Sequence, residues 1–190
     1  WNSDRDAAAI LTDETYVPGA CTPLYDAMGR TLTRLEKELR GDDKYSVVVT
    51  VITDGLENSS EEYSLAAIRG LVEHLKAKGW SFAYMGTDHD VQGVSVSLSI
   101  TNVIQFQKTE EETIRTFKKE RRAREKWAEE ENAFNLACPE ATYEERVAFS
   151  VGRAERYYDV DYYVNPAYAA RITPDKVKTL EKEEVFVFGS

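Results

Sequence analysis

The stretch Val47-Val48-Val49-Thr50-Val51-Ile52-Thr53-Asp54-Gly55 decides the expected fold. Its first six residues are all β-branched and do not alternate between apolar and polar, a pattern typical of a strand buried on both faces at the centre of a parallel sheet. Ligands of open parallel sheets bind outside the carboxyl ends of the strands. Asp54 directly follows the strand and is therefore a candidate binding residue, although Asp-Gly is also a common turn pair.

Helical and strand patterns alternate on both sides of this strand. Apolar spacing predicts helices over residues 23–39, 61–78, 91–100, 110–134 and 143–158, and strands over 80–85 and 103–106. This order predicts an α/β fold, a partial doubly wound (Rossmann-like) parallel sheet with flanking helices, followed by a mostly helical extension. The expected division is a sheet domain over 1–125, a helical extension or linker over 126–180, and a terminal strand over 181–190.

Composition excludes several classes of partner. The chain has 190 residues, a formal net charge of -10 and a pI near 4.8, so nonspecific binding to nucleic acid or to an anionic membrane surface is not expected. No apolar run approaches the ~18 residues of a membrane span. Cys21 and Cys138 show no disulfide pattern, which favours a reducing, cytoplasmic location. A metal cation or a basic protein surface fits this charge better.

Two segments with the right order and spacing carry a more specific signal: Gly19-Ala20-Cys21-Thr22-Pro23-Leu24-Tyr25-Asp26-Ala27 and Val51-Ile52-Thr53-Asp54-Gly55-Leu56-Glu57-Asn58. Together they resemble the second and third parts of the metal-ion-dependent adhesion site of von Willebrand factor type A domains. The resemblance is to the bacterial branch and runs from about Leu11 to Phe117. It implies a site for Mg²⁺ or Mn²⁺ with the Thr22 hydroxyl and the Asp54 carboxylate as ligands, a chemistry that suits hard oxygen donors.

The same resemblance implies a rim or outer ring around that cation, made of Asp26, Glu57, Asn58, Thr87 and Asp88. Two of these residues, Glu57 and Asn58, are expected to cap and orient the loop, and Asp26 is expected to be a surface or outer-ring residue. For Thr22 an alternative stays open, because a threonine before Pro23 is also a good N-cap of the following helix.

The chain departs from the family in lacking its first motif, Asp-x-Ser-x-Ser. It therefore resembles only the C-terminal part of the domain, and weak metal binding is expected, on the order of millimolar. Without the family's first strand, the strand at 47–52 is expected to leave an open sheet edge, and self-association through that edge is predicted. The tail, Glu184 to Ser190, resembles the opening strand of a macrodomain-like, Rossmann-type domain.

The leading hypothesis is a metal-ion-assisted protein-protein interaction module of a larger bacterial or phage protein, whose partner offers a carboxylate or a basic surface. An enzyme is not expected, because no nucleophile with a partner base is evident and neither His74 nor His89 lies in a catalytic pattern. One alternative is a structural spacer fragment without metal. Another is a phosphatase-type enzyme with Asp54 at a strand end, but Ile52 stands where such enzymes need a first aspartate.

Overall fold

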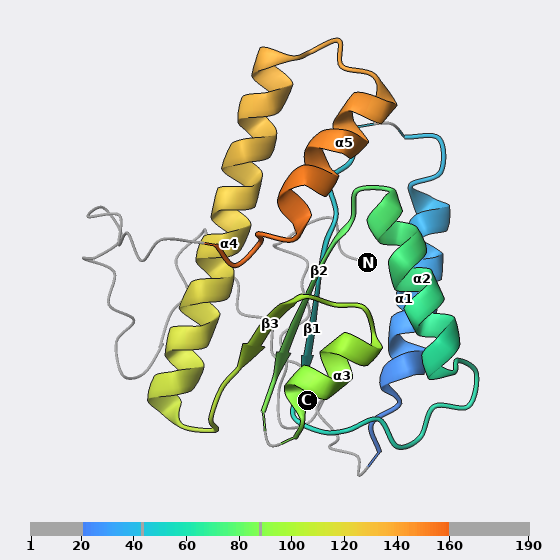
Figure 1. Cartoon of the computed structure of the whole chain (residues 1–190), viewed down its shortest axis with the longest axis vertical. Coiled ribbons are helices and arrows are strands. Elements are labelled where there is room, and N and C mark those ends of the chain that lie inside the picture. Colours follow the sequence, from blue (N-terminus) through green and yellow to red (C-terminus); the bar gives the residue numbers. More distant parts are fainter. Residues whose placement is uncertain (1–20, 43, 88, 160–190) are drawn as a thin grey trace, which may run out of the picture. The chain divides into compact units, whose positions relative to one another are not determined.

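The computed structural model describes residues 21–42, 44–87 and 89–159. Helices and strands alternate along them as predicted: α1 (Leu24–Glu38), β1 (Val48–Thr53), α2 (Leu65–Ala77), β2 (Ser81–Gly86), α3 (Val91–Ser97), β3 (Asn102–Gln105), α4 (Glu110–Ala137) and α5 (Tyr143–Ala154). The strands are parallel and helices flank the sheet (Figure 1). The predicted α/β, Rossmann-like fold class is confirmed. The largest differences are at the start of α2, which begins at Leu65 instead of residue 61, and at the end of α5, which stops at Ala154 instead of residue 158.

The sheet order is β1-β2-β3, so β2 and not β1 is the central strand of the described sheet. All six residues of β2 are buried, whereas most of β1 is only partly buried. The prediction that residues 47–52 form the sheet centre is therefore wrong for this part of the chain, whereas the expected edge position agrees with the described strand order. A run of β-branched residues indicates that helices cover both faces of the strand. It does not indicate whether other strands pair with it on one side or on both sides.

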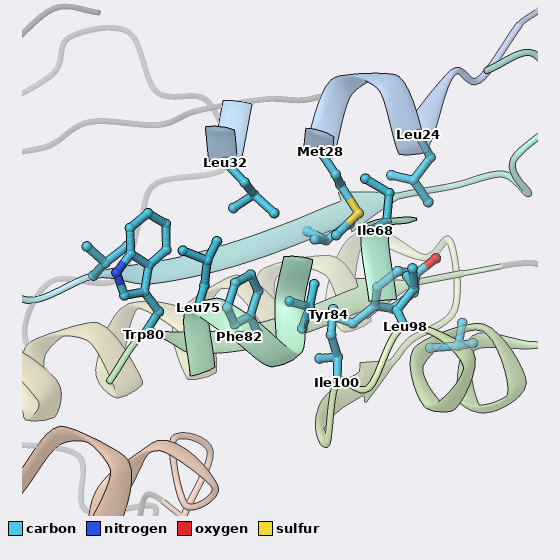
Figure 2. Packing of buried hydrophobic residues seen from close by; sticks show 14 residues of the cluster. Leu24, Met28, Leu32, Ile68, Leu75, Trp80, Phe82, Tyr84, Leu98 and Ile100 are labelled. Carbon is cyan, nitrogen blue, oxygen red and sulfur yellow. The ribbon is translucent and has the colours of Figure 1, made fainter. Parts of the chain in front are cut away.

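Alternate residues of the strands point to two different cores, one on each face of the sheet. The register pairs Val49 with Phe82 and Val51 with Tyr84, and these side chains belong to the larger core, against α1, α2 and α3. Figure 2 shows Met28 and Leu32 of α1 pointing toward this core. Its buried members are Leu24, Met28, Leu32, Val47, Val51, Ile68, Val72, Leu75, Trp80, Phe82, Tyr84, Val91, Leu98 and Ile100.

The opposite face of the sheet is covered by α4 and α5. Its core consists of Ala83, Ala123, Trp127, Ala154 and Tyr157. The buried residues of α4 are Thr116, Glu120, Ala123 and Trp127, which share one helix face. Trp127 is the large apolar side chain that anchors this helix, whereas Ile114, near the start of the same helix, is 44% exposed.

The predicted boundary at residue 125 falls inside α4, which continues without a break to Ala137. A buried carboxylate, Glu120 of α4, ties this helix and the segment after α5 to β1: it accepts hydrogen bonds from Thr50 Oγ1 at 2.7 Å, Tyr157 Oη at 3.1 Å and Tyr158 Oη at 2.7 Å. Burial raises the pKa of both tyrosines, and the nearby Glu120 charge raises it further. The part of the expected extension that the structure describes is thus packed onto the sheet.

Several predictions concern residues outside the described ranges: the terminal strand over 181–190, the segment before Cys21, and Asp88. Self-association through the outer edge of β1 stays a prediction. Cys21 and Cys138 are free and exposed, in agreement with the absence of a disulfide pattern. Among the described helices, none combines the length and the apolar character needed to cross a membrane.

Candidate functional site at the carboxyl edge of the sheet

The candidate site lies where the parallel strands end. Asp54 follows β1, Thr87 follows β2, and Phe106 to Lys108 follow β3. Because carboxyl ends of parallel strands share one edge, the segments after all three strands lie along this edge. The candidate residues are therefore brought to one side of the molecule by topology alone.

The start of α1 is held against the loop that follows Asp54. The Thr22 amide donates to Asn58 Oδ1 at 2.7 Å, and the Asn58 amide donates to the Thr22 carbonyl at 3.3 Å. The Thr22 hydroxyl lies 3.3 Å from the point that a Cβ on Gly55 would occupy. Thr22 and the loop of Asp54 are thus neighbours, which the resemblance required.

The N-capping alternative for Thr22 is wrong. The N-cap of α1 is Pro23, and no side chain of that segment caps the helix. The first-turn amides are satisfied from the loop instead: Glu57 Oε2 accepts from the Tyr25 amide at 2.9 Å, and Ser60 Oγ accepts from the Asp26 amide at 3.1 Å. A carboxylate also interacts favourably with the helix dipole at this end, so the helix leaves the Thr22 hydroxyl unused.

Glu57 is the hub of the loop. Besides the Tyr25 amide, its carboxylate accepts hydrogen bonds from the amides of Ser59 and Ser60, at 2.8 and 2.7 Å, and from Ser60 Oγ at 2.7 Å. Burial alone would raise the pKa of Glu57, but these donors, the Ser60 hydroxyl first, outweigh burial and lower it. The prediction that Glu57 and Asn58 cap and orient the loop is confirmed.

Asp26, in the first turn of α1, holds the end of the same loop through its carboxylate. It is only 7% exposed and accepts hydrogen bonds from the amides of Glu61, Glu62 and Tyr63, at 2.9, 2.9 and 2.8 Å. These amides, Glu61 first, lower the pKa of Asp26. The expectation of a surface residue is wrong, because the loop folds back over the first turn of α1 and covers the side chain.

Asp54 itself faces solvent, with 62% of its side chain exposed. Thr53 supports the turn below it, since its hydroxyl donates to the Gly55 carbonyl at 3.0 Å and accepts from the Gly55 amide at 3.2 Å. Lys108 Nζ lies 3.4 Å from Asp54 Oδ2. This ion pair connects the end of β1 to the segment after β3, and so spans the end of the central strand.

A histidine closes the end of β2. The Thr87 carbonyl, which is only an acceptor, lies 2.6 Å from His89 Nδ1, and the Tyr84 hydroxyl lies 3.1 Å from His89 Nε2. The hydrogen-bond partners therefore assign the proton to Nδ1, and Nε2 accepts from the hydroxyl. Burial raises the pKa of Tyr84 to about 12, which keeps that hydroxyl protonated. A Cβ on Gly86 would lie 2.9 Å from His89 Cε1, so the ring can lie here only over glycine.

Thr87 does not contribute its side chain to an open rim, because the residue is only 2% exposed. The residues that do line an open space were missed from the sequence. A cavity of about 840 Å³ is lined by His89, Gln105, Phe106, Gln107, Glu112 and Arg115. Asp54 was chosen because ligands bind outside the carboxyl ends of parallel strands. The same rule, applied to the carboxyl end of β3, would have pointed to this region.

The side chains near Asp54 decide whether the implied Mg²⁺ or Mn²⁺ can be held there. The Thr22 hydroxyl and the Asp54 carboxylate are hard oxygen donors, and Mg²⁺ is often held by one or two carboxylates with waters completing the shell. In the described ranges, however, no three or more His, Cys, Asp or Glu side chains are grouped as a metal site would need. The ammonium group of Lys108 already lies beside Asp54. These donors therefore fit weak binding of a hydrated divalent cation and do not fit a tight site.

Comparison of the chain with family models, with curated proteins and with solved structures finds no match. The fold and the site define an α/β protein with a three-stranded parallel sheet, helices on both faces and a braced loop at the carboxyl edge. The resemblance to the von Willebrand factor type A domain stays a prediction that depends on the two quoted motifs.

Proposed function

We propose that this chain is a protein-interaction module that contacts its partner through the carboxyl edge of the sheet, with a weakly held Mg²⁺ or Mn²⁺ at Asp54 and Thr22. The observation that carries the proposal is the braced loop after β1. Within this loop, Glu57 caps α1 and Glu62 pairs with Arg30, whereas the Glu61 side chain is exposed. Asp54, at the start of the loop, has an exposed side chain and stands on a turn that the Thr53 hydroxyl stabilises.

Rigidity supports recognition because little conformational entropy is lost when such a loop binds. The loop is tied to α1 and to the preceding residue Thr22 in its middle by Glu57 and Asn58, and at its end by the amides that donate to Asp26. An exposed carboxylate on a fixed turn, beside an unused hydroxyl, suits a hydrated cation that a partner's carboxylate completes. It also suits a direct ion pair with a basic partner.

Mn²⁺ titration of the ¹⁵N-labelled chain tests the proposal, because paramagnetic broadening detects binding in the millimolar range. We expect the amide signals of Thr22 and Gly55 to broaden first, and Asp54→Asn to abolish that selectivity. Asp42→Asn is the matched control, since Asp42 is exposed and precedes β1, near the opposite edge of the sheet. Equal broadening in wild type and Asp54→Asn would refute the metal site.

Lys108 offers a second variant for the same titration. The exposed ion pair between Lys108 and Asp54 contributes about 0.2–1 kcal/mol, and a cation bound at Asp54 competes with it. Lys108→Ala should therefore increase the Mn²⁺ affinity by roughly 1.4- to 5-fold. Lys37→Ala removes the same charge from the last turn of α1, away from Asp54, and should change the affinity less. A spacer without a metal role would show no response to either variant.

A further inference from the structure

We propose that the cavity beside the Asp54–Lys108 pair binds a basic segment of the partner protein, with an arginine side chain entering the cavity. The inference rests on the proposed function in one respect, that the partner is a protein bound at the carboxyl edge. The cavity volume of about 840 Å³ leaves room for a long side chain together with neighbouring backbone.

The lining of the cavity has the chemistry that such a side chain needs. Phe106 is partly exposed there and offers an aromatic face, which attracts a guanidinium group. Gln105 and Gln107 carry amides that both donate and accept, as the backbone of a bound peptide requires. Glu112, which is half-buried, supplies the carboxylate.

The cavity already holds a guanidinium group from its own chain. Arg115 Nη2 lies 2.8 Å from Glu112 Oε2, and both residues line the cavity. Because 63% of the Arg115 side chain is exposed, this pair is a surface ion pair that contributes little to stability. Glu112 is thus able to exchange its internal partner for an arginine from another protein.

Arg115 at the cavity and Lys108 beside it each pair with a carboxylate, Glu112 and Asp54 respectively, and further carboxylates nearby disfavour an acidic ligand. Glu110, Glu111 and Glu112 form the acidic first turn of α4, and they oppose the binding of an anion at this helix N-terminus. Asp90, next to His89, caps α3 by accepting from the Gly93 amide at 2.9 Å and adds a further negative charge. The whole chain, at a formal net charge of -10, attracts cations over a longer range.

The test uses the whole chain, ¹⁵N-labelled, and two synthetic probes, a nine-residue peptide alternating glycine and arginine and its glutamate counterpart. We expect the arginine peptide to shift the amide signals of Gln105, Gln107 and Arg115 most, and the glutamate peptide to shift none of them. Glu112→Gln should weaken the arginine peptide about threefold or more, the scale of one exposed charge contact. Glu129→Gln, an exposed change farther along α4, should weaken it less.

A variant that is expected to strengthen binding distinguishes binding in the cavity from general attraction by the negative charge of the chain. Arg115→Gln frees Glu112 and should strengthen binding of the arginine peptide more than Arg121→Gln, which removes the same charge elsewhere on the exposed face of α4. Equal effects of these two variants, shifts spread over other acidic surfaces, or preference for the glutamate peptide would each overturn the inference. The Mn²⁺ titration at Asp54 is read independently, so failure of the metal site and failure of this cavity are distinguishable.

Discussion

Replacing Glu57 with alanine removes the acceptor on which the loop after β1 depends. Its carboxylate accepts four hydrogen bonds, from the amides of Tyr25, Ser59 and Ser60 and from the Ser60 hydroxyl. One of these donors is in the first turn of α1, so the substitution also removes a negative charge from that helix end. We expect the variant to fold but to be clearly less stable.

The magnitude follows from these contacts. Hydrogen bonds to a charged group contribute about 1.5–3 kcal/mol each, but their sum overestimates the loss, because the amides of a partly exposed loop can turn to water. The lost interaction with the helix dipole adds about 0.3–1 kcal/mol. We expect the free energy of unfolding to fall by about 2–4 kcal/mol, which lowers the melting temperature by roughly 4–16 °C for a protein of this size.

Thermal unfolding followed by circular dichroism measures this change, with Glu61→Ala as the matched control. Glu61 lies in the same loop and carries the same charge, but its side chain is exposed, and the amide that it donates to Asp26 is kept in alanine. If the two variants melt within about 2 °C of each other, a difference of about 0.5–1 kcal/mol, the carboxylate of Glu57 does not hold the loop.

Acid titration of Glu57→Gln checks the same reasoning by a second route. The pKa of Glu57 in the folded protein is below its ordinary value of 4.5. The stability that it contributes is therefore present above about pH 4.5 and is lost as the pH falls through the folded-state pKa. The melting temperature of Glu57→Gln should decline less steeply below pH 4.5 than that of wild type. Equal slopes would contradict the assigned role.

Two further predictions concern packing on the two faces of the sheet. Gly29→Ala should destabilise, because a Cβ there would lie 2.4 Å from ring carbons of Tyr63, whereas Gly70→Ala, with nothing within 4 Å, should stabilise by about 1 kcal/mol through helix propensity. Opposite signs in thermal melts support this, and equal signs refute it. Glu120→Gln should lower the free energy of unfolding by about 2–3 kcal/mol, and Tyr158→Phe by about 1 kcal/mol, in urea unfolding. No change in Glu120→Gln would show that α4 and α5 dock independently of this carboxylate.

Elements that depend on local periodicity were predictable from the sequence. The apolar spacing within α1 and the short apolar strands gave boundaries close to those in the structure, and the end of α2 was close as well. The placement of Asp54 at a carboxyl strand end also followed, because only the parallel connection of strand and helix is needed to deduce it. Each of these inferences uses residues that are neighbours along the chain or share one helix face.

Contacts between distant segments were not predictable in the same way. Asp26 was expected to be a surface or outer-ring residue, and nothing within α1 reveals that residues 61–63 cover it. Thr22 has the sequence context of an N-cap, yet Glu57, 35 positions later by numbering, supplies the cap in its place. The charged Glu57 carboxylate is a stronger acceptor than the Thr22 hydroxyl and takes its place at the helix start. The sequence pattern of α1 alone cannot show this, because Glu57 lies in another segment.

The roles of the remaining polar groups narrow the choice of functional residues. Most polar residues of the quoted motif have structural partners: Thr53 closes the turn, Glu57 caps α1, and Asn58 pairs with Thr22. Their presence in the sequence is explained by the loop itself, without any ligand. The exposed carboxylate of Asp54 is different, because its contact with Lys108 is a surface ion pair of small energetic value. The loop begins with a carboxylate that contributes so little to stability, and the rest of the loop has much internal support, which favours the proposed recognition of a partner.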